Sequence, residues 1–357
     1  LKSLMILGMS GLLAACGGGS TTQSGSDAYL VKEPDGYVYG INSLAAKRTY
    51  RTLIYFTSAV PNLNYMETSE AADAQHFANF VDGLLTHNEF GVLTKNLATK
   101  AETNSDYTQF KFTIRKDVPW VTYDGTQYEA TVNGVREKQF VKPSDWLASA
   151  KAILTANNAS GLEYLISDFV KGAAEYYYYT ELMYLIATNP TAKKQYGTAA
   201  KQAKYINDKI KENKENLWNS YYSDNPIEEE DLPNIKNMSR LGITADDEAG
   251  TLTYDLIQSA FYFPTLLTYS CYLPVNQYYL SDIGFKSFGT ANDKILYCGP
   301  FLFTEEGDNQ LTYTRNQSYF NQDIINVDQV IYTVYDNSIG NDYTRTQYFK
   351  GNIEFIF

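Results

Sequence analysis

Short apolar runs that fit β-strands alternate along this chain with segments whose apolar residues recur at helical spacing. Residues 52–56 form a continuous strand-like run, and apolar and polar residues alternate between positions 110 and 114 as they do in a half-buried strand. Residues 301–303 and 329–335 are two further strand-like runs. Because strand-like and helix-like segments follow one another in turn, the pattern predicts an α/β chain with a mixed sheet.

Two helices are expected from their periodicity and their start signals. The first is expected to continue through residue 85, because its apolar positions recur at helical spacing: Ala74, Phe77, Val81 and Leu84. Asn64, with Glu67 three residues later, forms a capping pair that would start this helix. The second helix is predicted to open at Pro143, with Ser144 as its cap.

The middle of the chain differs in composition from the rest. Residues 171–231 are rich in Tyr, Lys, Glu and Asn, and we expect this segment to be helical. The acidic run at 228–231 lacks the Asp-x-Asp-x-Asp-Gly spacing of a calcium loop and is interpreted as a solvated loop. Residues 242–256 are predicted to form a hairpin.

The N-terminal segment has the features of a secretion signal. A basic residue precedes an apolar run at residues 4–15, which is shorter than the roughly 20 residues needed to span a bilayer. The three residues before Cys16 read Leu-Ala-Ala, the form of a lipobox, and glycines follow directly. We therefore predict a lipoprotein signal peptide at 1–16, lipidation of Cys16, and a flexible tether at 17–35.

Charge and histidine content limit the function classes. The formal charge of −12 argues against nucleic-acid binding, which needs a basic surface. His76 and His87 are the two histidines of the chain, and no H-E-x-x-H, G-x-S-x-G or P-loop motif is present. We expect no enzyme activity, no cofactor and no metal site. Cys271 and Cys298 are expected to be buried thiols, and their pairing as a disulfide stays open.

Several blocks of the sequence resemble, in order, the extracellular solute-binding family that serves peptide ABC importers. The most extended block is FKFTIRKDVPW at residues 110–120. The other blocks lie, in chain order, at residues 77–85, 142–146, 166–173, 263–264, 273–276, 297–301 and 315–320. The resemblance covers the chain from about residue 53 to residue 335. It departs from the family at 171–231, which is longer than usual, and at Cys298, where Asn is frequent.

The resemblance implies a two-lobed fold of the periplasmic-binding-protein type II class, in its peptide-binding subclass, with mixed sheets. The first lobe is then expected at 36–335, with a helical insertion at 171–231. Residues 336–357 would begin a second lobe that is largely missing from this chain.

The same resemblance implies a substrate-binding lipoprotein that captures extracellular oligopeptides in an interlobe cleft and delivers them to the permease subunits of an ABC importer. It would be held by Cys16 on the outer face of the cell membrane, on a Gram-positive surface rather than in a periplasm. Gly299 is expected to let the ligand backbone approach closely. The candidate ligand-binding residues form a loop and a turn: Asn62, Leu63, Asn64, Tyr65, Tyr297, Cys298, Gly299, Pro300 and Phe301.

Three other functions stay open. A carboxylate pair for glycoside hydrolysis cannot be recognised or dismissed from sequence, so a surface carbohydrate-binding or glycoside-processing lipoprotein is one of them. A surface adhesin is a second, although no internal repeat is present. A binder of a non-peptide solute in the same family is the third.

Overall fold

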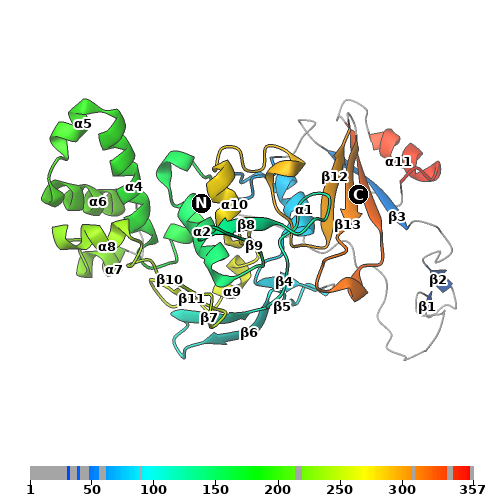
Figure 1. Cartoon of the computed structure of the whole chain (residues 1–357), viewed down its shortest axis with the longest axis horizontal. Coiled ribbons are helices and arrows are strands. Elements are labelled where there is room, and N and C mark those ends of the chain that lie inside the picture. Colours follow the sequence, from blue (N-terminus) through cyan, green and yellow to red (C-terminus); the bar gives the residue numbers. More distant parts are fainter. Residues whose placement is uncertain are drawn as a thin grey trace.

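The computed structural model describes residues 30–32, 38–40, 48–55, 62–88, 90–213, 219–307, 310–335 and 341–353 (Figure 1). The predicted signal peptide, Cys16 and most of the predicted tether lie outside the described residues. No described helix is long and apolar enough to cross a membrane.

One four-stranded sheet is antiparallel throughout and has the strand order β10-β11-β7-β6. The predicted hairpin is confirmed as β10 (Ile243–Asp246) and β11 (Thr251–Asp255). The predicted alternating strand is confirmed as β7 (Gln109–Ile114), whose apolar residues are buried at every second position. The sequence did not indicate β6 (Ala98–Thr103), because five of its six residues are exposed.

A second sheet has the order β12-β13-β14-β3 and is mixed, as predicted. β12 (Phe301–Glu306), β13 (Gln310–Arg315) and β14 (Gln329–Tyr335) are antiparallel neighbours. β3 (Thr49–Tyr55) pairs in parallel with β14, although most of the chain lies between these two strands. Figure 1 shows this sheet at the opposite end of the molecule from the middle helices.

Three two-stranded ribbons complete the strands of the described residues, and none of them was predicted from the sequence. Their strands are β1 (Leu30–Lys32) with β2 (Val38–Gly40), β4 (Leu85–His87) with β5 (Leu93–Lys95), and β8 (Glu129–Val132) with β9 (Val135–Lys138).

The first predicted helix is present, but both of its predicted ends are wrong. α1 spans Ala71–Phe80, and Val81 is already extended, with a φ of −134°. Val81 and Leu84 are nevertheless buried, because the chain runs on through the core before entering β4. The apolar spacing is therefore a property of the core, and only its first half belongs to a helix.

The predicted capping pair instead stabilises a turn. The Asn64 side chain accepts a hydrogen bond from the Met66 N–H at 3.2 Å, and the Glu67 carboxylate accepts one from the Asn62 amide at 3.2 Å. Helix α1 starts four residues later, after Glu70.

The second predicted helix is confirmed as α2 (Pro143–Ile153). Its N-cap is Lys142 rather than Ser144, because the Lys142 N–H donates to the Asp145 carboxylate at 3.1 Å. Ser144 lies inside the first turn, where its N–H and hydroxyl both donate to Asp247.

Most of the described residues between 171 and 231 are helical, as predicted, and Figure 1 shows these helices gathered at one end of the molecule. Of the acidic run, Glu228, Glu229 and Glu230 are exposed, but Asp231 is paired with Arg240 at 2.7 Å. Arg240 also holds the buried Glu175 at 2.9 Å, which fastens the helices to the chain that follows them. The segment contains α4 (Ala173–Thr188), α5 (Pro190–Gln195), α6 (Ala199–Asn213) and α7 (Asn219–Asp224), with α8 (Leu232–Lys236) directly after it.

The remaining helices are short and lie between or beyond the sheets. They are α3 (Tyr164–Ser167), α9 (Phe263–Leu266), α10 (Gln277–Ile283) and α11 (Asn341–Phe349). Cys271 and Cys298 are both buried and free, as expected.

Candidate functional site

The loop predicted to bind ligand is anchored to the chain segments that precede and follow α10. Leu63 donates its N–H to the Gly289 carbonyl at 3.2 Å, and the Asn64 amide donates to the Phe285 carbonyl at 3.2 Å. The Tyr65 hydroxyl donates to the Pro274 carbonyl at 2.8 Å. These three side chains are buried, and Asn62 is the exposed member of the loop.

The predicted turn before β12 is fastened to the end of α1. Cys298 and Gly299 both donate their N–H groups to the Phe80 carbonyl, at 3.0 and 2.7 Å. A methyl group on Gly299 would lie 2.7 Å from the Phe80 carbonyl carbon. The segment that approaches this glycine closely is therefore the end of α1, whereas a ligand backbone was expected there. Tyr297 and Phe301 are also buried, and Pro300 is half-buried.

The two predicted segments meet around α1. The Tyr65 ring lies 6.0 Å from that of Phe77, and the Tyr297 ring lies 5.6 Å from that of Phe80. Burial raises the pKa of Tyr65, and the neighbouring Cys298 raises it further. The nine predicted residues therefore form one contiguous group, in which Asn62 and Pro300 reach the surface.

Two buried carboxyl groups, those of Asp82 and Asp145, lie close enough to Cys298 to raise the pKa of its thiol. Burial raises the pKa of Asp82 to about 6, and hydrogen bonds from Asn96 and Tyr319 offset part of this rise. Burial likewise raises the pKa of Asp145 to about 7, although the Trp120 indole donates to it at 2.9 Å. Burial and the Asp82 carboxylate raise the pKa of the Cys298 thiol. A thiol kept protonated in this way is a poor nucleophile.

The two histidines lie in different surroundings. His76 is buried and hydrogen-bonded to the Tyr313 hydroxyl, and burial lowers its pKa to about 3, so that it stays neutral. His87 is half-buried in β4. Within the described ranges, no three His, Cys, Asp or Glu side chains are placed to hold a metal ion.

A pocket of about 560 Å³ lies between the mixed sheet and the last described segment, and we call it the boundary pocket. Its floor is a row across three strands, because Gln310 pairs with Thr333 and Thr333 with Leu53. Its other wall comes from α11 and the turn after it. The lining residues are Arg51, Leu53, Gln310, Thr333, Tyr343, Gln347, Gly351, Asn352 and Ile353.

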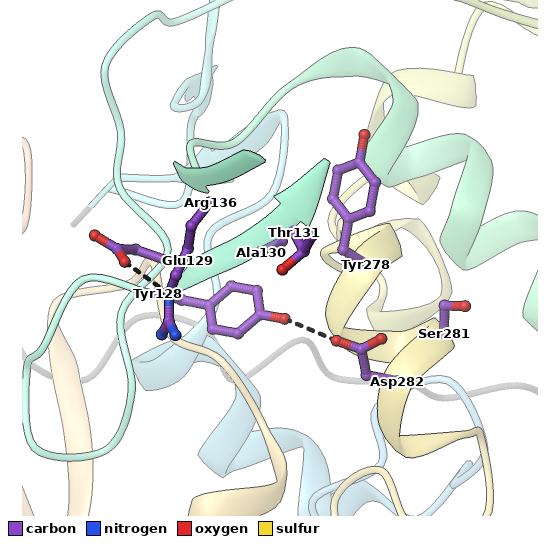
Figure 2. Close-up of a pocket in the computed structure, with 8 residues that line it drawn as sticks. All are labelled: Tyr128, Glu129, Ala130, Thr131, Arg136, Tyr278, Ser281 and Asp282. Carbon is purple, nitrogen blue, oxygen red and sulfur yellow. Dashed lines mark hydrogen bonds and ion pairs between the residues drawn. The ribbon is translucent and has the colours of Figure 1, made fainter. Parts of the chain in front are cut away.

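A second pocket, of about 510 Å³, lies between the β8–β9 hairpin and α10, and we call it the hairpin pocket (Figure 2). The Tyr128 hydroxyl donates to the Asp282 carboxylate at 3.3 Å. The Arg136 guanidinium pairs with Glu129 at 2.9 Å. The lining residues are Tyr128, Glu129, Ala130, Thr131, Arg136, Tyr278, Ser281 and Asp282.

Neither pocket was predicted from the sequence. The boundary pocket depends on the parallel pairing of β3 with β14, which no local pattern reveals. The hairpin pocket had a local signal that was missed. Asn133 and Gly134 connect β8 to β9 with φ values of 50° and 82°, and Asn-Gly between two short strands is the strongest short-range hairpin signal.

Comparison with curated proteins finds relatives named as oligopeptide-binding proteins, and no family model matches the chain. The chain is 25% identical over 277 residues to the oligopeptide-binding protein SarA of Streptococcus gordonii, across 77% of this chain and 32% of SarA. It is 26% identical over 290 residues to AliA of Streptococcus pneumoniae, across 80% of this chain and 34% of AliA. AmiA of the same species is 24% identical over 338 residues, across 94% of this chain and 38% of AmiA.

Solved structures share the fold. A periplasmic oligopeptide-binding protein of Borrelia burgdorferi superposes with a TM-score of 0.59 and 18% identity, over 86% of this chain and 46% of that one. The peptide-bound OppA of Listeria monocytogenes gives a TM-score of 0.57 with 15% identity, over 87% of this chain and 46% of that one. This chain therefore has part of the two-lobed solute-binding fold, and it spans about a third of the length of the curated relatives it matches.

Proposed function

We propose that this chain, as a relative of the bacterial oligopeptide-binding proteins, forms one wall of a clamp. The clamp captures extracellular oligopeptides for an ABC importer. The observation that carries the proposal is the similarity to relatives named for oligopeptide binding, which extends over 77% to 94% of this chain. Capture is by closure of two lobes and involves no covalent chemistry.

The boundary pocket is the proposed place of capture. It lies between the sheet of the proposed first lobe at 36–335 and the proposed start of the second lobe at 336–357. β3 is the last strand of that sheet among the described residues, and a strand at a sheet edge can hydrogen-bond the main chain of an extended peptide.

The side chains of the boundary pocket suit ligands of variable sequence. Gln310, Thr333, Gln347 and Asn352 are uncharged and polar, and Arg51 is the charged member of the lining. Such groups hydrogen-bond peptide amides directly or through water and make few demands on ligand side chains. This is the chemistry that broad peptide capture requires.

The nine residues of the predicted loop and turn divide by exposure. We propose that Asn62 and Pro300, which lie outside the lining of the boundary pocket, contact the part of the ligand that extends beyond it, and that the seven buried residues hold these two in place on α1. We also propose that Cys16 is lipidated and anchors the protein on the outer face of the membrane, where it meets the permease. The lipobox and the glycines after it support this anchor.

Calorimetry with a mixture of pentapeptides tests the proposed place of capture. The double variant Thr333→Ala, Gln347→Ala removes two polar groups from the boundary pocket, each worth about 1 kcal/mol, so peptide affinity should fall roughly 30-fold. The matched control is Thr191→Ala, Gln195→Ala on α5, which should bind as the unmodified protein does. Unchanged affinity in the boundary-pocket variant would place capture elsewhere.

A further inference from the structure

The hairpin pocket contains a carboxylate without a counter-ion. Asp282 is exposed at the end of α10 and accepts a hydrogen bond from the neutral Tyr128 hydroxyl. Among the described residues, no Lys, Arg or His lies within ion-pair distance of it, whereas the neighbouring Glu129 is paired with Arg136. The negative charge of Asp282 is therefore available to a ligand that enters the pocket.

The Tyr128 hydroxyl is held in the form that can donate to this carboxylate. Burial and the Asp282 charge raise the pKa of Tyr128 to about 12, so the phenol remains protonated at neutral pH. The Tyr128 ring also packs edge-on against Tyr279, with ring centroids 5.3 Å apart. These two contacts hold the Tyr128 ring in place beside Asp282.

An aromatic ring borders the carboxylate. Figure 2 shows the Tyr128 ring pointing toward Asp282, with Tyr278, Ser281 and Asp282 all projecting from α10 and the Tyr278 ring directed away from the carboxylate. The Tyr278 ring is engaged by a cation of this chain, since the Lys142 ammonium lies 5.1 Å from its centroid, which leaves Tyr128 as the ring beside Asp282. A tyrosine ring and a carboxylate together form surroundings that favour an ammonium or guanidinium group.

We propose that the hairpin pocket is an accessory binding site for a cationic side chain, the ammonium of a lysine or the guanidinium of an arginine. Asp282 pairs with the charge, and the Tyr128 ring packs against the aliphatic stem. The pocket volume of about 510 Å³ is sufficient for one such side chain. The formal charge of −12 favours the approach of cations.

This site is separate from the boundary pocket. The two pockets share no lining residue, and they are built from different elements, β8–β9 with α10 in one case and β3, β13 and β14 with α11 in the other. Binding of a cationic side chain at the hairpin pocket therefore does not depend on the proposed capture of peptides.

Titration with two single-residue probes, followed by protein NMR, tests the proposal. Nα-acetyl-arginine methylamide should bind with a dissociation constant in the millimolar range. Nα-acetyl-citrulline methylamide has nearly the same shape without the charge, and it should bind at least fivefold more weakly. Asp282→Asn keeps an acceptor for Tyr128 but removes the charge, so it should abolish the preference for arginine.

The control variant is Asp293→Asn, whose carboxylate is exposed and paired with Lys294 outside the pocket lining. It should bind the arginine probe as the unmodified protein does. Equal binding of the two probes, or an arginine preference that survives Asp282→Asn, would overturn the proposal. So would loss of arginine binding in Thr333→Ala, Gln347→Ala, because the probe would then occupy the boundary pocket.

Discussion

Replacing Asp145 with asparagine should remove a large part of the pH dependence of this protein's stability. Asp145 is completely buried in the first turn of α2. It accepts hydrogen bonds from the Trp120 indole at 2.9 Å and from the Lys142 N–H at 3.1 Å. An asparagine oxygen can accept the same two bonds without carrying a charge.

The magnitude follows from the pKa of Asp145. Burial raises this pKa from 3.8 to about 7, so the folded protein holds a proton that the unfolded chain releases. The resulting stability is fully present below about pH 3.8 and is lost as the pH rises through about 7. Each tenfold difference in proton affinity is worth about 1.4 kcal/mol, so about 3 kcal/mol should be lost between pH 5 and pH 8.

Urea unfolding at pH 5 and pH 8 measures this loss. Asp145→Asn should reduce the difference between the two pH values by about 3 kcal/mol. The difference that remains combines two opposing effects: the raised pKa of Asp82, about 6, lowers stability between pH 5 and pH 8, whereas the lowered pKa of His76, about 3, raises it. The control Asp208→Asn, an exposed acid paired with Lys204 on α6, should keep the full difference. A full difference in Asp145→Asn would refute the assignment of this proton to Asp145.

Three further predictions concern packing and anchoring. Phe77→Ala should cost roughly 3–5 kcal/mol of unfolding free energy, since Phe77 is 2% exposed. His87→Ala should cost little, and equal losses for the two variants in urea melts would contradict the packing of α1. Gly299→Ala should cost roughly 1–3 kcal/mol of unfolding free energy, because the added methyl group would collide with the end of α1. The control Gly307→Ala meets only an ordinary contact at 3.6 Å. Equal melting temperatures of the two variants would show that α1 shifts to make room for the methyl group. Cys16→Ser should move the protein from the membrane to the medium of a Gram-positive host, and retention at the membrane would mean that another segment anchors it.

Local periodicity predicted the strands and helices whose buried residues recur at a regular spacing. Phe110, Phe112 and Ile114 are buried in β7 as the sequence indicated, because a period of two depends only on neighbouring residues. The same reasoning extended α1 too far. Val81 and Leu84 continue the helical spacing, but they are buried from an extended segment, and spacing alone does not distinguish the two.

The site was less accessible to sequence reasoning than the fold. The loop at Asn62 and the turn at Gly299 were selected by resemblance, and the structure brings them together on α1. The boundary pocket requires Leu53, Thr333 and Gln310 to align across three strands. That alignment joins distant parts of the chain, and its register is set by long-range packing that a single sequence does not display.

Native mass spectrometry of the protein expressed from its complete gene tests the central claim most directly. The claim is that this chain forms one wall of a clamp for oligopeptides. Protein purified without denaturation should carry a set of co-purifying peptides of mixed sequence, and these should be released when the protein is unfolded. Release of a saccharide or a metal chelate in place of peptides would contradict the claim.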